Sequence, residues 1–140
     1  MRCDVLAVGT ELLLGQIVDT NSAWIGEQLA TAGIDSYLHV QVGDNQARMV
    51  AQLRALLADA DAVIVCGGLG PTQDDITREA IAEVMGAPLE RRDDLADAIR
   101  EMFASRGRSM PASNLRQADV PRAASRYRTP TAPPPGCCAP

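Results

Sequence analysis

The stretch GGLGPTQDDITREA, residues 67–80, is the most direct indication of the fold. It follows a short apolar run, AVIVC at residues 62–66, which is typical of a buried strand in a parallel sheet. Glycines at the end of a strand let backbone N–H groups approach a phosphate, and a helix start behind them favours an anion. We therefore expect a phosphate-binding turn here. A tight strand-to-helix turn with ordinary cap residues is the alternative interpretation.

The charges of this turn need an explanation. Thr72 and Asp75 have the spacing of a capping box at the start of a helix. Asp74 adds a second, adjacent carboxylate, and the pair would repel a bare phosphate. The conflict indicates either a bridging cation such as Mg²⁺ or an acid that acts chemically on the bound phosphate. The phosphate-binding candidates of the turn are Gly67, Gly68, Gly70 and Thr72.

Strands and helices alternate along the chain. The sequence predicts buried strands at residues 5–8, 38–42 and 62–66, each followed by a helix. Such alternation predicts an α/β fold, with a parallel sheet covered by helices and right-handed crossovers. Residues 10–19 are expected to form a long loop. Trp24 lies at helical spacing with other apolar residues, so we expect it in the core.

Polar residues gather where the predicted strands end. Ligands on parallel sheets bind beyond the carboxyl ends of the strands. Residues 9–11, 43–44 and 67–70 should therefore converge on one crevice. The leucines at residues 12–14 predict that the first of these loops packs down and holds Glu11 over the crevice. The acidic candidates are Glu11, Asp19, Asp44, Asp74 and Asp75, of which Asp19 and Asp44 are equally well explained as helix caps.

Composition excludes several classes of protein. The chain has 140 residues, a net charge of −5 and no lysine, which argues against a nucleic-acid surface and against a P-loop. Its single histidine, His39, and its cysteine spacing offer almost no zinc ligands. No apolar run is long enough to span a membrane, and the charged N-terminus is unlike a signal peptide. We expect a cytoplasmic protein with a single α/β domain.

Three motifs follow one another along the chain: GTELLLGQIVDTN at residues 9–21, VGDN at residues 42–45 and GGLGPTQDDIT at residues 67–77. In this order they resemble the N-terminal domain of the competence/damage-inducible protein A (CinA) family. This domain is similar to the wider MoaB/Mog class of molybdopterin-binding proteins. The resemblance implies a three-layer α/β/α domain with a mostly parallel sheet, extending over residues 1–119.

The resemblance also implies a function. Members of the class bind molybdopterin and either adenylylate it or insert molybdenum, and the CinA branch is associated with metal-dependent hydrolysis of ADP-ribose. Their essential acids match Asp44 and Asp75, our candidate catalytic residues. Leu69 stands where the molybdenum-cofactor enzymes usually have a threonine, and the family's separate amidase domain has no counterpart in this sequence. The expected ligand-binding residues are Gly9, Thr10, Glu11, Gly67, Gly68, Gly70 and Thr72, and the expected metal ligands are Asp74, Asp75 and Glu11.

These motifs predict a domain that binds a phosphorylated pterin or nucleotide together with a divalent metal, Mg²⁺ or Co²⁺. Hydrolysis of a pyrophosphate is one possible outcome. An inactive fragment, or a module that only binds a ligand or oligomerises, is the alternative. The expected partners are a small-molecule phosphate and further copies of the chain, and neither nucleic acid nor membrane is expected.

Residues 120–140 differ from the rest. They hold three of the thirteen arginines, no acid and most of the prolines, which predicts a disordered tail. The family continues here with a segment like Pro-Asn-Pro-x-Gly-Thr-Ala-Pro-Gly. Codons that fit residues 127–138 read Pro-Asn-Pro-Asn-Gly-Thr-Ala-Pro-Gly in a shifted frame. We therefore hypothesise a frameshift near residue 121 that leaves the domain incomplete, with a natural tail as the alternative.

Overall fold

The computed structural model describes residues 1–122 and residue 124. The chain divides into two compact units, Met1–Gly68 and Leu69–Pro140, and each is described by itself. The boundary falls inside the GGLGPTQDD turn, between Gly68 and Leu69, so the expected domain of residues 1–119 extends over both units.

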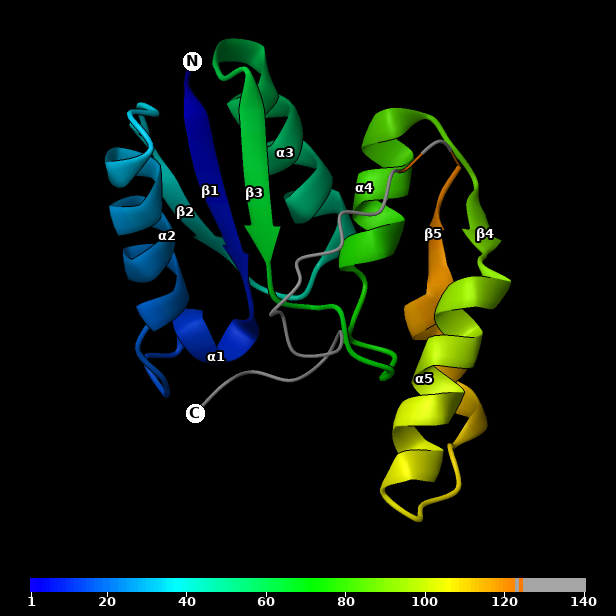
Figure 1. The fold of residues 1–140 in the computed structure, drawn as a ribbon. Helices are drawn as coiled ribbons and strands as arrows, with labels where there is room; N and C mark the ends of the chain where they lie inside the picture. The colour runs from blue at the N-terminus through cyan, green and yellow to red at the C-terminus, as the bar shows by residue number, and fades with distance from the viewer. Residues whose placement is uncertain (123, 125–140) are drawn as a thin grey trace. The chain divides into compact units, whose positions relative to one another are not determined.

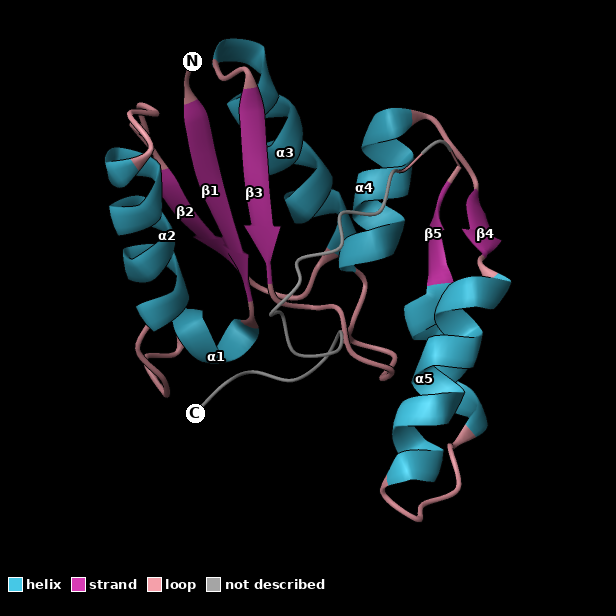
Figure 2. Ribbon diagram, in the orientation of Figure 1, coloured by secondary structure: helices cyan, strands magenta, loops and turns pink. Residues whose placement is uncertain are grey.

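A parallel sheet of three strands forms the centre of the first unit. Strand β1 (Cys3–Val8) lies between β2 (His39–Val42) and β3 (Ala62–Cys66). All six residues of β1 are buried, as expected for a central strand covered on both faces. Figures 1 and 2 show the three strands running in the same direction. The parallel sheet predicted from the sequence is confirmed.

Helices cover both faces of this sheet. Helix α1 (Thr10–Leu13) is short, whereas α2 (Thr20–Thr31) and α3 (Gln46–Asp59) are long enough to cover a face. In the strand order β2-β1-β3, right-handed crossovers place α2 and α3 on opposite sides of the sheet, as Figure 1 shows. The unit therefore has the predicted α/β/α layers.

Alternating side chains of β1 form the two halves of the core. On one face Cys3 and Val5 pack against Leu29 of α2, with partly buried apolar residues around them. The alternate residues point to the other face, which α3 covers. The buried residues of α3 are Met49, Val50, Leu53 and Leu56.

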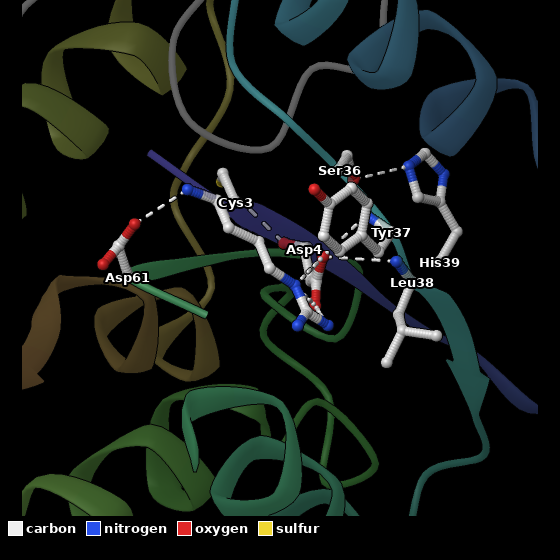
Figure 3. A network of polar contacts seen from close by, with 8 residues as sticks. Cys3, Asp4, Ser36, Tyr37, Leu38, His39 and Asp61 are labelled. Atoms are coloured by element: carbon white, nitrogen blue, oxygen red, sulfur yellow. Dashed lines mark hydrogen bonds and ion pairs between the residues drawn. The ribbon is translucent and has the colours of Figure 1, made fainter. Parts of the chain in front are cut away.

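A buried ion pair fixes the beginning of the sheet. The Asp4 side chain is fully buried and accepts hydrogen bonds from the Arg2 guanidinium, the closest at 2.7 Å. It also accepts from the backbone N–H groups of Tyr37, at 3.0 Å, and Leu38, at 3.2 Å, just before β2 (Figure 3). Asp4 therefore links the first strand to the chain that enters the second.

The second unit combines helices with a small antiparallel ladder. It contains α4 (Thr77–Met85), β4 (Leu89–Arg91), α5 (Asp93–Ser105), a 3₁₀ helix η1 (Ala112–Ala118) and β5 (Asp119–Pro121). Strands β4 and β5 pair antiparallel. Its core is formed by Ala96 and Ile99 of α5 with Ala118 of η1. The sequence predicts α4 and α5 but neither η1 nor this pair of strands.

Several local predictions are wrong. Trp24 is 62% exposed in the first unit rather than in the core. Residues 10–13 form helix α1 rather than a loop, and Leu13 and Leu14 are exposed, so the leucines do not pack down as expected. Of the expected tail, Val120 and Pro121 belong to β5, and residues 123 and 125–140 lie outside the described residues.

Candidate functional site

In the first unit a polar cluster joins the loops that follow β1 and β2. The two strands end side by side, with Val8 opposite Val42. The N–H and the hydroxyl of Thr10 donate to the same oxygen, Oδ2 of Asp44, at 2.9 and 2.8 Å. The N–H of Asp44 donates in return to the Thr10 hydroxyl at 3.2 Å. Two bonds thus hold the carboxylate of Asp44, and a third holds its backbone, at the carboxyl edge of the sheet.

The helix-cap interpretation is wrong for Asp44 and right for Asp19. Asn45 caps α3 by accepting from the N–H of Arg48. Asp19 caps α2, accepting from the N–H and hydroxyl of Ser22 at 2.9 and 2.6 Å. Burial raises the pKa of Asp19, but the Ser22 and Gln41 hydrogen bonds outweigh it and leave the pKa below its ordinary value. Its local role is therefore fully explained by helix capping.

Glu11 lies near the same cluster, in the first turn of α1. It is exposed, and its carboxylate lies against the backbone of Gly9. A Cβ added at Gly9 would come within 2.6 Å of the Glu11 Oε1 atom. A Cβ at Gly43 would come within 3.3 Å of the Thr10 hydroxyl. Both glycines therefore leave room for the polar side chains that the sequence identified.

The backbone conformation gives a structural reason for glycine at positions 67 and 68. Both have positive φ, +94° and +61°, which favours glycine. A Cβ added at Gly67 would lie 2.0 Å from the carbonyl oxygen of Val8. The close approach of this turn to β1 requires a glycine at position 67 whether or not a phosphate binds there.

In the second unit the turn before α4 is organised around Asp75. The N–H of Thr72 donates to Asp75 Oδ2 at 2.8 Å, and the Thr72 hydroxyl donates to the same oxygen. A Cβ added at Gly70 would lie 2.6 Å from this oxygen. The structure therefore brings together Gly70, Thr72 and Asp75. The adjacent Asp74 is exposed.

The predicted capping box is not the start of a helix. Helix α4 begins at Thr77, with Ile76 as its N-cap residue, and no side chain caps it. The bonds between Thr72 and Asp75 instead close a separate turn, which the backbone N–H of Asp75 completes by donating to the Thr72 carbonyl at 3.3 Å. Asp75 is therefore available for a role other than helix capping.

The surroundings of Asp75 keep it ionised. Burial acts to raise its pKa, but hydrogen bonds from the Thr72 side chain and backbone and from the Gly70 backbone, with the charge of Arg78, lower it below its ordinary value. A carboxyl group that is ionised at neutral pH suits a metal ligand or a proton acceptor better than a proton donor. Of the two chemical roles predicted for this turn, a lowered pKa is less compatible with an acid that protonates the bound phosphate.

Two arginines that the sequence analysis did not identify hold the same turn. Arg78 is buried, and its guanidinium donates to the carbonyls of Leu69 and Gly70 at 2.6 and 2.9 Å. Arg116, from η1, donates to the carbonyl of Thr72 and, at 2.9 Å, to Glu79. Burial lowers the pKa of Arg78. Arg78 lies within the stretch of residues 67–80 and Arg116 lies outside every motif, but nothing in the sequence shows which carbonyl groups either residue binds.

The described part of the chain contains no group of three histidine, cysteine or acidic side chains arranged to hold a metal ion. A Mg²⁺ ion does not need such a cage, because it is commonly held by one or two carboxylates together with substrate phosphates and water. Among the described residues, no helix is both long and apolar enough to cross a membrane.

Comparisons with known proteins agree with this architecture. The family model described as "Probable molybdopterin binding domain" matches residues 4–135. A CinA-like protein of Desulfovibrio desulfuricans is 44% identical over 140 residues, which cover all of this chain and 32% of that protein. The chain thus spans about a third of the length of the curated relatives it matches.

Solved structures extend the similarity to the fold. The crystal structure of the protein CinA with unknown function from Thermoplasma acidophilum aligns with a TM-score of 0.82 and 30% identity, covering 94% of this chain and 76% of that one. The tungsten cofactor synthesizing protein MoaB from Pyrococcus furiosus aligns with a TM-score of 0.57 and 24% identity, covering 75% and 66%. The second similarity shows the fold alone.

Proposed function

The chain belongs to the molybdopterin-binding domain family, in its CinA branch, and from this premise we propose that it binds a phosphorylated pterin or nucleotide together with a divalent cation. The ligand is of the molybdopterin or ADP-ribose type, which joins an organic group to a phosphate or pyrophosphate. Two residues carry the proposal, Asp44 and Asp75, which match the essential acids implied by the family resemblance.

The observation that supports it is a repeated arrangement. In each unit a threonine donates both its N–H and its hydroxyl to the Oδ2 atom of an aspartate: Thr10 to Asp44, and Thr72 to Asp75. Such bonds hold a carboxylate in one orientation and favour its charged form. Within each unit, a carboxylate that is held and charged in this way suits the binding of a divalent cation.

The side chains present fit a hard divalent cation. In the second unit Asp74 and Asp75 offer adjacent carboxylates on one turn. In the first unit Glu11, the other metal ligand expected from the sequence, offers a separate carboxylate. Oxygen donors of this kind suit Mg²⁺, and one or two of them suffice when phosphates complete the coordination. A bound cation would supply charge neutralisation for the phosphates and would lower the pKa of a bound water.

Hydrolysis of an ADP-ribose-type pyrophosphate is the second candidate function. The ionised state of Asp75 favours it, because a charged carboxylate serves either as a metal ligand or as a base. The reaction would consume one water and yield AMP and ribose 5-phosphate. Binding without turnover, and an inactive chain that only oligomerises with intact relatives, are the alternatives.

One experiment separates these functions. ADP-ribose is titrated into the protein by calorimetry with and without Mg²⁺ or Co²⁺, and AMP is measured by chromatography in the same samples. Metal-dependent binding with AMP formation supports the enzyme, and metal-dependent binding alone supports the binding module. The proposal would be refuted if the protein neither bound nor hydrolysed ADP-ribose and also failed to bind molybdopterin in a parallel titration.

We also propose that the protein forms homo-oligomers in the cytoplasm. Trp24 is the only tryptophan of the sequence and is 62% exposed in the first unit, so its fluorescence reports on the surface of α2. Analytical ultracentrifugation gives the number of subunits. An acrylamide-quenching experiment on the same samples shows whether assembly covers Trp24. A chain that sediments as a monomer at all concentrations would contradict this proposal.

A further inference from the structure

We propose that Arg78 and Arg116 are positioning residues for the proposed ligand-binding turn, residues 69–75. They bind its carbonyl groups and thereby direct its amide N–H groups toward the side where Asp75 lies. The inference rests on the proposed function, in which this turn receives the phosphate and the cation. It concerns residues that contact the backbone of the turn and not the ligand.

The contacts of Arg78 are specific to backbone carbonyls. Its two terminal nitrogens bind two consecutive carbonyl oxygens, those of Leu69 and Gly70. The residue is only 6% exposed, which is rare for an arginine and costs free energy unless the group is well bonded. A buried guanidinium that binds two neighbouring peptide groups fixes the orientation of both.

Peptide geometry carries this orientation to the amide groups. In a trans peptide the carbonyl and the following N–H point in opposite directions, and the described residues contain no cis peptide. With the Leu69 carbonyl bound by Arg78, the N–H of Gly70 is directed away from that arginine. The Asp75 carboxylate lies on this opposite side, close to Gly70. The arginine and the aspartate thus hold the two ends of one peptide group.

Arg116 does the same at the other end of the turn. It reaches the Thr72 carbonyl from η1, across 44 positions of sequence, and is kept in place by an ion pair with Glu79 of α4. Its neighbour Gln117 also donates to the Leu69 carbonyl, at 3.4 Å. Three side chains from α4 and η1 therefore bind carbonyls of residues 69, 70 and 72.

Arg78 also balances part of the charge of the turn. Asp74 and Asp75 place two carboxylates within residues 70–75, which alone would repel a phosphate. The guanidinium of Arg78, which is bonded to the backbone of the same turn, offsets part of this repulsion, whereas the charge of Arg116 is balanced by its ion pair with Glu79. Arg78 therefore reduces the repulsion that an anionic ligand would meet at this turn.

The test compares Arg116→Gln with Arg100→Gln. Arg100 is exposed on α5, where it pairs with Asp97, so its variant makes the same charge change in the same unit without touching the turn. Three quantities are measured: the thermal midpoint, the exchange rates of the Gly70 and Thr72 amide protons by NMR, and the affinity for ADP-ribose with Mg²⁺ by calorimetry. Arg78→Lys and Arg116→Lys serve as conservative variants if the glutamine variant does not fold.

In Arg116→Gln we expect the amide protons of Gly70 and Thr72 to exchange faster. The variant should bind ADP-ribose about tenfold more weakly, as for the loss of one charged hydrogen bond. Its thermal midpoint should stay close to that of Arg100→Gln, and Arg116→Lys should recover part of the affinity. Unchanged exchange rates, or unchanged affinity despite faster exchange, would overturn the inference. If the unaltered protein binds neither ADP-ribose nor molybdopterin, the proposed function fails, and the exchange rates alone still decide whether the arginines orient the amides.

Discussion

Thr72 and Asp75 are joined through a single carboxylate oxygen, because both the N–H and the hydroxyl of Thr72 donate to Asp75 Oδ2. Thr10 and Asp44 repeat this relationship in the other unit. In both cases the threonine follows a glycine-containing turn, and the aspartate is not the cap of a helix. The pairing orients each carboxylate before any ligand arrives, which lowers the cost of binding one.

The first prediction concerns the hydroxyl of Thr72. In Thr72→Val the N–H bond to Asp75 remains and the hydroxyl bond is lost, so the pKa of Asp75 should rise toward its ordinary value. Stability should fall by about 1 kcal/mol, and metal-dependent ligand affinity should fall severalfold. Carbon NMR titration of the Asp75 carboxyl measures the pKa directly.

Thr31→Val is the matched control for this change. The Thr31 hydroxyl donates to the Glu27 carbonyl within α2, so the pKa of Asp75 should be unaffected by its loss. Equal pKa values in the two variants would show that the Thr72 hydroxyl does not control the charge of Asp75.

The second prediction concerns Gly67. In Gly67→Ala the new Cβ would lie 2.0 Å from the Val8 carbonyl oxygen, at a φ of +94°. The turn must move away from β1, and we expect a loss of about 3 kcal/mol or more in the free energy of unfolding. Urea unfolding of the variant measures this loss.

Gly15→Ala isolates the backbone contribution. Gly15 also has positive φ, +66°, but a Cβ there meets nothing within 4 Å. The loss in the free energy of unfolding of Gly15→Ala should therefore be limited to the strain of the left-handed backbone, about 1–2 kcal/mol. If both alanine variants lose the same stability, the close approach of residue 67 to β1 is not what requires the glycine.

The third prediction concerns acid. Burial raises the pKa of Asp4, but the bonds from Arg2, Tyr37 and Leu38 outweigh it, so its folded pKa is below the ordinary value. The stability that Asp4 contributes is therefore complete above about pH 4, the unfolded pKa, and is lost as the pH falls through the folded pKa. Thermal unfolding from pH 7 down to pH 2 should show a steep loss below about pH 4.

Asp4→Asn tests the source of this loss. The variant should be less stable at neutral pH by about 2 kcal/mol, and its stability should change less with acid, although Asp19 and Asp75 still contribute. Asp97→Asn, which removes an exposed charge paired with Arg100, should behave like the unaltered protein. An acid profile of Asp4→Asn that parallels the unaltered one would contradict the role of the buried pair.

Sequence patterns predicted the parts of the fold that depend on periodicity. The apolar runs predicted the three parallel strands, and Asp19 caps α2 as one of its two interpretations expected. Trp24 was misplaced because helical spacing shows that residues share a face but not whether that face is covered. The short strands β4 and β5 have too few residues for a periodic signal.

The sequence predicted which residues belong to the candidate site better than it predicted how they are arranged. The pairings of Thr72 with Asp75 and of Thr10 with Asp44 join residues that were already candidates. The start of α4 was placed too early, because the Thr72–Asp75 spacing fits a capping box and a closed turn equally well. Arg78 lies within residues 67–80 and Arg116 lies outside every motif, but the carbonyl groups that they bind can be found only from the structure.

The most direct test of the central claim is the Mg²⁺-dependent affinity for ADP-ribose of Asp75→Asn, measured by calorimetry beside Asp19→Asn. Asparagine keeps an oxygen that can accept the Thr72 bonds, so stability should change by about 1 kcal/mol or less. Removal of the charge should lower metal-dependent affinity by about 100-fold, whereas Asp19→Asn, which still caps α2, should bind like the unaltered protein. Full metal-dependent affinity in Asp75→Asn would contradict the assignment of this turn as the binding site.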